Sequence, residues 1–156
     1  MTDAYSVNFI QDYHFLVALI SHLSATQHKN RTPRDIAGSL AMDHQEVERV
    51  LLAYPGFFRQ SINRSQHTGE RLFTVHLRYA LRRKGEGSNN YNEPLPPDSI
   101  ALMLSLVAEM VSNERQESRM KADLQQRNKA TRWTVLVAVG TALLSSFTAL
   151  LVAIVK

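Results

Sequence analysis

Cysteine is absent from this chain of 156 residues. Without thiols the protein forms no disulfide bonds, and metal sites built from thiolates are excluded. The six histidines show no metal-ligand spacing. A glycine-rich phosphate loop and a serine nucleophile elbow are also missing. These absences leave no catalytic constellation, so we expect a protein that is not an enzyme and that carries no metal and no cofactor.

Charge is missing from the 23 residues that run from Trp133 to Val155. A helix of that length is roughly 34 Å long, enough to cross a hydrocarbon core of about 30 Å with modest tilt. Its serines and threonines can bond to the helix backbone, so none of them forbids insertion. The alternative, a buried helix of a globular domain, is usually much shorter. The sequence therefore predicts one transmembrane helix at 133–155, and hence a tail-anchored protein held by membrane lipid.

Basic residues gather on one side of this predicted span. Five lysines and arginines lie between residues 119 and 132, whereas Lys156 alone follows the span. The positive-inside bias therefore places the N-terminal domain in the cytoplasm. Two triplets of the glycosylation type, at 30–32 and 63–65, are idle in that orientation because they matter only in a secretory lumen. The expected localisation is a single-pass membrane protein.

Three helices are predicted in the first part of the chain. Residues 8–24 repeat apolar side chains at three- and four-residue steps, with Asn8 as a cap. Thr32 followed by Pro33 begins a second helix, and Asp43 caps a third. Only a tight turn fits between the second and third helices. These two short helices are therefore expected to cross at a steep angle.

A hairpin is predicted to follow the third helix. Residues 57–62 have a strand composition, and residues 71–81 alternate apolar and polar side chains with the period of a half-buried strand. The segment 63–70 between them is rich in turn-forming residues, and Gly69 can adopt the positive φ that a bend needs.

This order of elements resembles the winged helix-turn-helix family over about residues 8–82. In that family two small residues four apart are followed by apolar residues of the next helix. Those positions are Ala37, Ala41, Val47 and Val50 here, and residues 59–78 would form the wing. Ala41 stands where the family most often has glycine. The resemblance implies a small α+β winged-helix domain. Together with a long helical stalk and the single transmembrane helix after it, the expected protein is mainly α.

The resemblance also implies a surface for double-stranded DNA. It would place residues 43–54 in the major groove and the tip at 63–70 near the minor groove or the backbone. Three side chains of the helix would approach base edges: His44, Gln45 and Arg49. Phosphates would be held by Arg59, Arg64, Arg71 and Arg78, and Arg34 is a further base nearby. A membrane-tethered DNA-binding regulator is the first hypothesis.

Acidic residues on the same helix support a second hypothesis. Asp43, Glu46 and Glu48 accompany the single Arg49, and carboxylates that face phosphates reduce affinity. The alternative is a membrane adaptor whose winged helix binds a protein partner and uses Glu46 and Glu48 as recognition charges.

The rest of the chain divides into a linker, a stalk and the span. After a domain at 1–84, residues 85–98 are rich in Gly, Asn and Pro and predict a flexible linker, and residues 99–132 predict a helical stalk. The apolar stripe at 100–111 can fold back on the domain, pair with its own copy as a coiled coil, or receive a partner. We expect self-pairing, because the stripe is heptad-like. Small residues on one face of the span (Ala138, Ala142, Ser145, Ala149 and Ala153) also favour a homo-oligomer.

Overall fold

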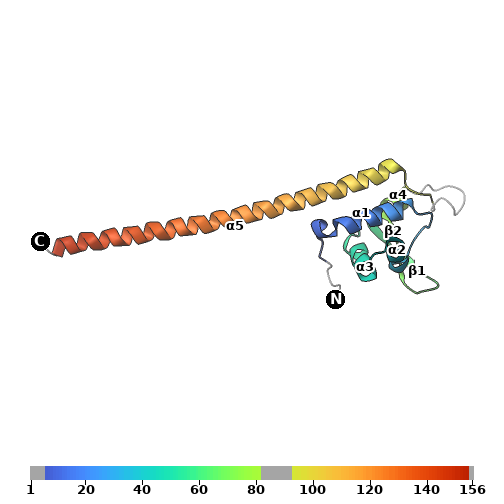
Figure 1. Ribbon diagram of the computed structural model, residues 1–156, viewed down its shortest axis with the longest axis horizontal. Helices are drawn as coiled ribbons and strands as arrows, with labels where there is room; N and C mark the ends of the chain where they lie inside the picture. The colour runs from blue at the N-terminus through green and yellow to red at the C-terminus, as the bar shows by residue number, and fades with distance from the viewer. Residues whose placement is uncertain (1–5, 82–92, 155–156) are drawn as a thin grey trace. The chain divides into compact units, whose positions relative to one another are not determined.

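The computed structural model describes the backbone of residues 6–81 and 93–154, and the side chains of residues 6–81 and 93–127 (Figure 1). The elements in order are α1 (Phe9–Ala25), α2 (Pro33–Leu40), α3 (His44–Ala53), β1 (Phe58–Arg64), β2 (Arg71–Val75), α4 (His76–Ala80) and α5 (Pro97–Ile154). The described chain is mainly helical, with a two-stranded antiparallel sheet. The predicted order of three helices and a hairpin is confirmed. The chain forms two compact units, residues 1–114 and 115–156.

Each of the first three helices begins at its predicted cap. The side chains of Asn8, Thr32 and Asp43 each accept a hydrogen bond from the backbone N–H three residues later, at 2.8, 3.1 and 2.9 Å. These bonds satisfy donors that a helix start would otherwise leave without a partner. The short polar caps therefore set where the chain enters each helix.

The turn between α2 and α3 depends on one residue in an unusual conformation. Ala41 has φ 52° and ψ 43°, in the left-handed region, and the Met42 N–H donates to the Ala37 carbonyl at 3.0 Å. A Cβ atom in this region costs roughly 1–2 kcal/mol. The turn is short enough to require that conformation even though alanine occupies it.

We therefore expect Ala41→Gly to stabilise the first unit by about 0.5–1 kcal/mol, because glycine adopts the left-handed conformation without strain. Part of this gain is offset, because glycine has more conformational freedom in the unfolded chain. The same substitution at Ala108, exposed within α5, is the matched control. There it should destabilise by about 1 kcal/mol. Urea unfolding of both variants measures the difference, and a loss of stability in Ala41→Gly would show that the turn is not strained.

The hairpin pairs β1 with β2 in an antiparallel register that sets Arg59 opposite Thr74 and Gln60 opposite Phe73. Gly69 has φ +70° at the tip, as predicted. On its other edge Phe73 exchanges two backbone hydrogen bonds with Arg31, of 2.9 and 2.8 Å. The loop between α1 and α2 is therefore attached to the sheet.

The predicted strand at 71–81 is wrong beyond Val75, because the chain turns there into the helix α4. The His76 N–H makes the last bond across the hairpin, to the Phe57 carbonyl at 2.7 Å. The N–H of Phe57 already bonds back to Tyr54 at the end of α3. The opposing chain thus leaves the sheet at this point, and residues after 76 have no strand to pair with.

The core of the first unit lies between α1, α2, α3 and the hairpin, and it continues past the predicted domain boundary at residue 84. Leu95 is buried, and its N–H donates to the Ser24 carbonyl at 2.9 Å. Part of the predicted linker at 85–98 is therefore fixed on the domain, and α5 begins at Pro97. Residues 85–92 of that linker lie outside the described residues.

The apolar stripe at 100–111 folds back on its own domain. Met103 and Val107 belong to the same core as α1 to α3, and Val111 is buried as well. This is the first of the three alternatives for Met103, Val107 and Val111, whose side chains are covered by their own chain. Pairing with a second copy through the rest of the stripe stays a prediction.

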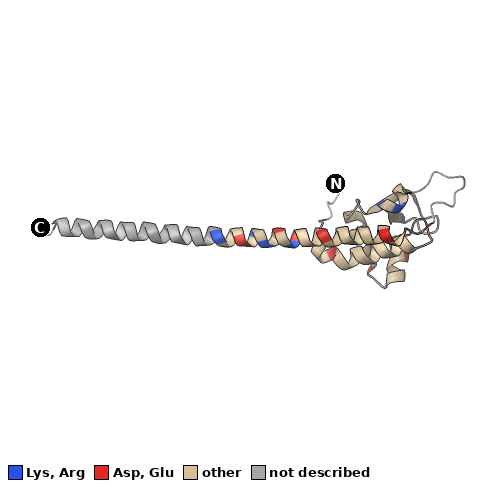
Figure 2. Ribbon diagram, turned by 90° about the horizontal axis from the view of Figure 1, so that it is seen from above, with Lys and Arg blue, Asp and Glu red and all other residues tan. Residues whose placement is uncertain are grey.

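Beyond this point α5 is charged and exposed. Figure 2 shows acidic and basic residues interspersed along its described part. Lys121 pairs with Glu117 at 3.9 Å, which is one of the acid-before-base pairs expected of a solvated helix. Within the part that the structure describes, no helix is long and apolar enough to cross a membrane. The side chains of the predicted span at 133–155 and of its small-residue face lie outside the described residues, so both remain predictions.

Candidate binding surface

A buried charge network joins α1 to α3. Asp12 is 1% exposed, and its carboxylate accepts two hydrogen bonds from the Arg49 guanidinium. It also accepts a bond of 2.9 Å from the hydroxyl of Tyr54, which in turn accepts the Asn8 N–H at 3.0 Å. Hydrogen bonding to Asp12 raises the pKa of Arg49, and burial raises the pKa of Tyr54. Both groups therefore keep their protons, and the carboxylate keeps its donors, across the physiological pH range.

This network changes the role expected for Arg49. Its Nε also donates to Glu46 at 2.9 Å, so one guanidinium serves two carboxylates. The side chain is 28% exposed. The structure therefore uses Arg49 to neutralise a buried acid, and a base edge would have to compete with Asp12 for the same N–H groups.

Asp12 was not predicted as a site residue, although its place in the sequence carries a signal. Residues 12, 16 and 20 are four apart in α1, and Leu16 and Ile20 are fully buried. An acid on an apolar face requires a cation and further donors nearby, because an isolated buried carboxylate is very costly.

Two more ion pairs surround a hollow between α2, α3 and the hairpin. We use the name wing for this hairpin, residues 58–75. Arg34 pairs with Glu70 at 2.8 Å, and Arg71 lies 3.7 Å from Glu48. The hollow has a volume of about 350 Å³. Its lining is formed by Pro33, His44, Glu48, Arg64, Thr68, Gly69, Glu70 and Arg71. We call this region, together with the exposed face of α3, the α3–wing face.

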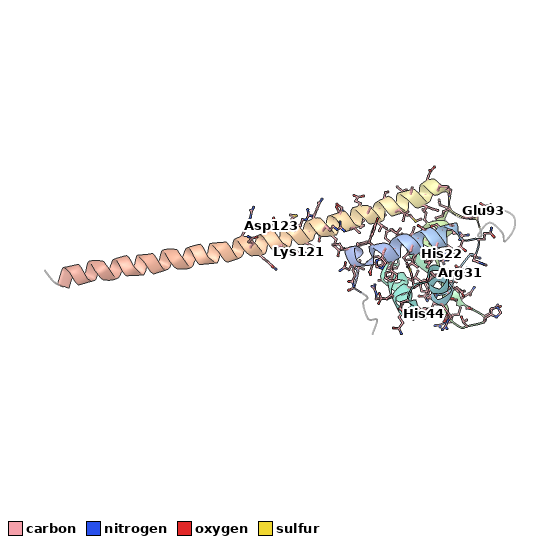
Figure 3. All side chains as sticks on the ribbon, viewed as in Figure 1. His22, Arg31, His44, Glu93, Lys121 and Asp123 are labelled. Carbon is pink, nitrogen blue, oxygen red and sulfur yellow. The ribbon has the colours of Figure 1, made fainter. Side chains whose placement is uncertain are left out.

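The structure brings most of the predicted contact residues to this face. His44 begins α3 (Figure 3) and lines the hollow beside Glu48, Arg64 and Arg71. Gln45 is exposed next to it. Arg64 is exposed at the wing, where its guanidinium donates to the Gly69 carbonyl at 3.2 Å.

Arg78 and Arg59 lie elsewhere. Arg78 is 7% exposed, and its guanidinium donates to the carbonyls of Glu93, Leu23 and His28 at 2.9 to 3.1 Å. Burial lowers the pKa of this arginine. Arg78 therefore holds together the end of α1 and the segment before α5. The prediction of a strand over 71–81, which included Arg78, did not indicate this role.

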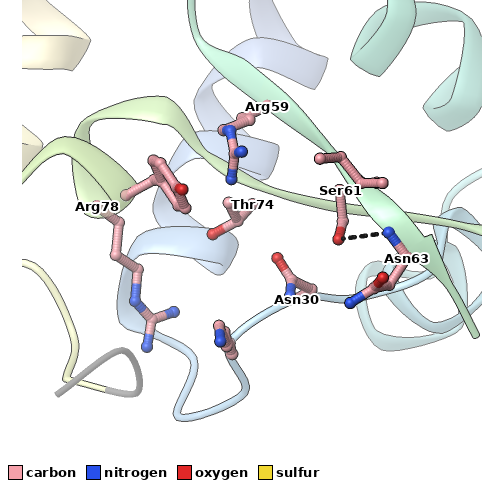
Figure 4. A pocket seen from close by; sticks show the side chains of 9 residues that line it. Asn30, Arg59, Ser61, Asn63, Thr74 and Arg78 are labelled. Atoms are coloured by element: carbon pink, nitrogen blue, oxygen red, sulfur yellow. Dashed lines mark hydrogen bonds between the residues drawn. The ribbon is translucent and has the colours of Figure 1, made fainter. Parts of the chain in front are cut away.

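Arg59 lines a second hollow, of about 290 Å³, which shares no residue with the first (Figure 4). The carbon at the centre of its guanidinium lies 3.4 Å from the centre of the Tyr79 ring. A cation held this way over an aromatic face is attracted by the ring electrons, and its plane is fixed by the stacking.

The comparisons with known proteins give no further assignment. No protein-family model, curated protein or solved structure matches the chain. Among the described residues, no group of three or more potential ligands is placed to hold a metal ion.

Proposed function

We propose that this protein is a membrane-held, non-enzymatic adaptor whose winged-helix domain binds a protein partner through the α3–wing face. The order of three helices and a hairpin, with a tight turn between α2 and α3, supports the winged-helix assignment. The charge-free stretch at 133–155 supports the membrane anchor.

The observation that carries the proposal is the charge balance of the α3–wing face. Arg34, Arg49 and Arg71 each lie beside a carboxylate of the same face or of α1. The surface pairs Arg34–Glu70 and Arg71–Glu48 contribute only about 0–1 kcal/mol each, so a ligand can open them. What disfavours DNA is the placement of Glu46, Glu48 and Glu70 where phosphates would have to lie, because each adds repulsion to a polyanion.

A surface of mixed, paired charges suits a protein ligand. Protein interfaces are often rimmed by charges of both signs, and complementary charges across them select the partner and fix its orientation. Gln45 and the half-buried His44 add an amide and an imidazole as hydrogen-bonding groups on this face. The hollow beside them offers a place for one partner side chain.

The second candidate is a membrane-held DNA-binding regulator. Arg64 favours it, because this side chain is exposed at the wing and its described hydrogen bond is to a carbonyl rather than to a carboxylate. One such arginine can contact a phosphate without first breaking an ion pair.

Site-specific photo-crosslinking in intact cells tests the proposal. A photoreactive residue at Gln45 should join the full chain to a defined protein. The same residue at Gln27, exposed in the loop after α1, should not. Crosslinking of position 45 to DNA, or equal protein crosslinking at both positions, would contradict the adaptor.

The membrane part of the proposal has a separate test. Alkaline carbonate should leave the full chain in the membrane pellet, and a variant with charges introduced into 133–155, such as Leu143→Lys with Leu144→Lys, should be released. A single lysine at the centre of a span costs about 2.5–3.5 kcal/mol, so two suffice to oppose insertion. Release of the unaltered chain would remove the anchor from the proposal.

A further inference from the structure

We propose that the hollow around Arg59 binds a phosphate monoester. This goes beyond the adaptor function, because it concerns a different ligand and residues that do not line the α3–wing hollow. Its volume of about 290 Å³ is near the lower limit of ligand pockets, roughly 300–1,000 Å³, and so suits a small phosphorylated molecule.

The sheet register builds this hollow from residues far apart in the chain. Arg59 faces Thr74 across the hairpin, and Ser61 follows on the same face because side chains alternate along a strand. The bridge between Arg31 and Phe73 brings the loop with Asn30 to the other edge of β2. Figure 4 shows the side chains of Arg59, Thr74 and Asn30 directed toward the same space.

The charge of this hollow differs from that of the α3–wing face. Lys29, Arg59 and Arg78 line it, and no Asp or Glu is found among its described lining residues. An anion in this hollow would meet the guanidinium of Arg59, whose described contact is the ring of Tyr79. Thr74, 5% exposed, is a hydroxyl held inside the same positive surroundings.

The donors present match a phosphate better than a carboxylate. Stacking on Tyr79 fixes the plane of the Arg59 guanidinium, so that its N–H edge can present parallel donors to two oxygens. Asn30, Ser61 and Thr74 add amide and hydroxyl donors around it. A phosphate monoester has three terminal oxygens to occupy these groups, whereas a carboxylate has two.

Isothermal titration calorimetry on the full-length chain in detergent micelles tests this site, with inorganic phosphate and glycerol phosphate as probes at constant ionic strength. We expect saturable binding to one site per chain. Arg59→Gln should weaken it about tenfold or more, which corresponds to the loss of a charged hydrogen bond. Arg59→Lys should recover only part of the affinity, because an ammonium cannot make the bidentate contact.

Arg34→Gln is the matched control, since it removes the same charge from the α3–wing face and should leave binding unchanged. Circular dichroism should show that all three variants are folded. The proposal fails if neither probe gives saturable binding, or if Arg34→Gln weakens binding as much as Arg59→Gln does, because the effect would then be one of net charge. Neither result bears on the crosslinking at Gln45, so the two proposals fail independently.

Discussion

Replacing Arg49 by methionine should lower the free energy of unfolding of the first unit by about 3–5 kcal/mol. The reason is that the change leaves the carboxylate of Asp12, 1% exposed, without its cation inside the domain. Methionine replaces the apolar stem of the arginine side chain as far as Nε, so little packing is lost. Urea unfolding of the full chain, followed by circular dichroism, measures the effect.

Removing the charge of Asp12 instead of that of Arg49 should cost less stability. In Asp12→Asn the guanidinium of Arg49 can still turn to water and to Glu46, since it is 28% exposed. The double variant should lose less stability than the sum of the two single changes, because the residues form one network. Arg34→Met, at a side chain 69% exposed, is the control and should change stability by less than about 1 kcal/mol. A cost below 1 kcal/mol for Arg49→Met would show that Asp12 does not depend on it.

The outcome also decides how binding data on Arg49 must be interpreted. If its substitution unfolds part of the domain, lost affinity for any partner reports folding rather than contact. Gln45, exposed and adjacent to the same surface, is therefore the more informative position for binding experiments.

A charge at Val107 should prevent the first unit from folding. Val107 is fully buried in the core, and an unpaired carboxylate there costs several kcal/mol, a large share of the stability of a small domain. We expect Val107→Asp to abolish the cooperative unfolding transition of the full chain. This follows from α5 being part of the domain and not a separate stalk at this point.

Leu106→Asp is the matched control, at a neighbouring side chain that is 40% exposed, and it should leave the transition within about 1 kcal/mol of the unaltered chain. If the stripe instead paired with a second copy, Val107→Asp would leave a folded monomer and the unaltered chain would unfold at a concentration-dependent midpoint. That pair of results would support self-pairing through 100–111.

The local features of the fold could be predicted because they depend on neighbouring residues. The caps at Asn8, Thr32 and Asp43 and the bend at Gly69 each act within a few positions of the chain. The errors came from contacts between distant segments. The alternation at 71–81 describes a strand correctly only while another strand lies beside it, and the sequence does not reveal that the partner ends at Phe57.

The candidate binding surface shows the same difference between local features and contacts of distant segments. Basic residues near the wing were found by their type, but their partners were not: Arg49 meets Asp12 across 37 positions and Arg34 meets Glu70 across 36. The hollow around Arg59 depends on the sheet register and on the bridge at Arg31, and neither has a sequence signature. Charge counts along the chain therefore could not distinguish a free cation from one already engaged.

The salt dependence of DNA affinity tests most directly whether the arginines of the α3–wing face are engaged by the protein's own carboxylates. Fluorescence anisotropy of the full chain with random duplex DNA, between 50 and 200 mM salt, gives the slope of log affinity against log salt, and each phosphate contact contributes roughly −0.9. We expect a slope no steeper than about −1, which is the contribution of Arg64 alone. A slope of about −3 or steeper that becomes shallower in Arg34→Gln and Arg71→Gln would contradict this, and would make the protein a DNA-binding regulator.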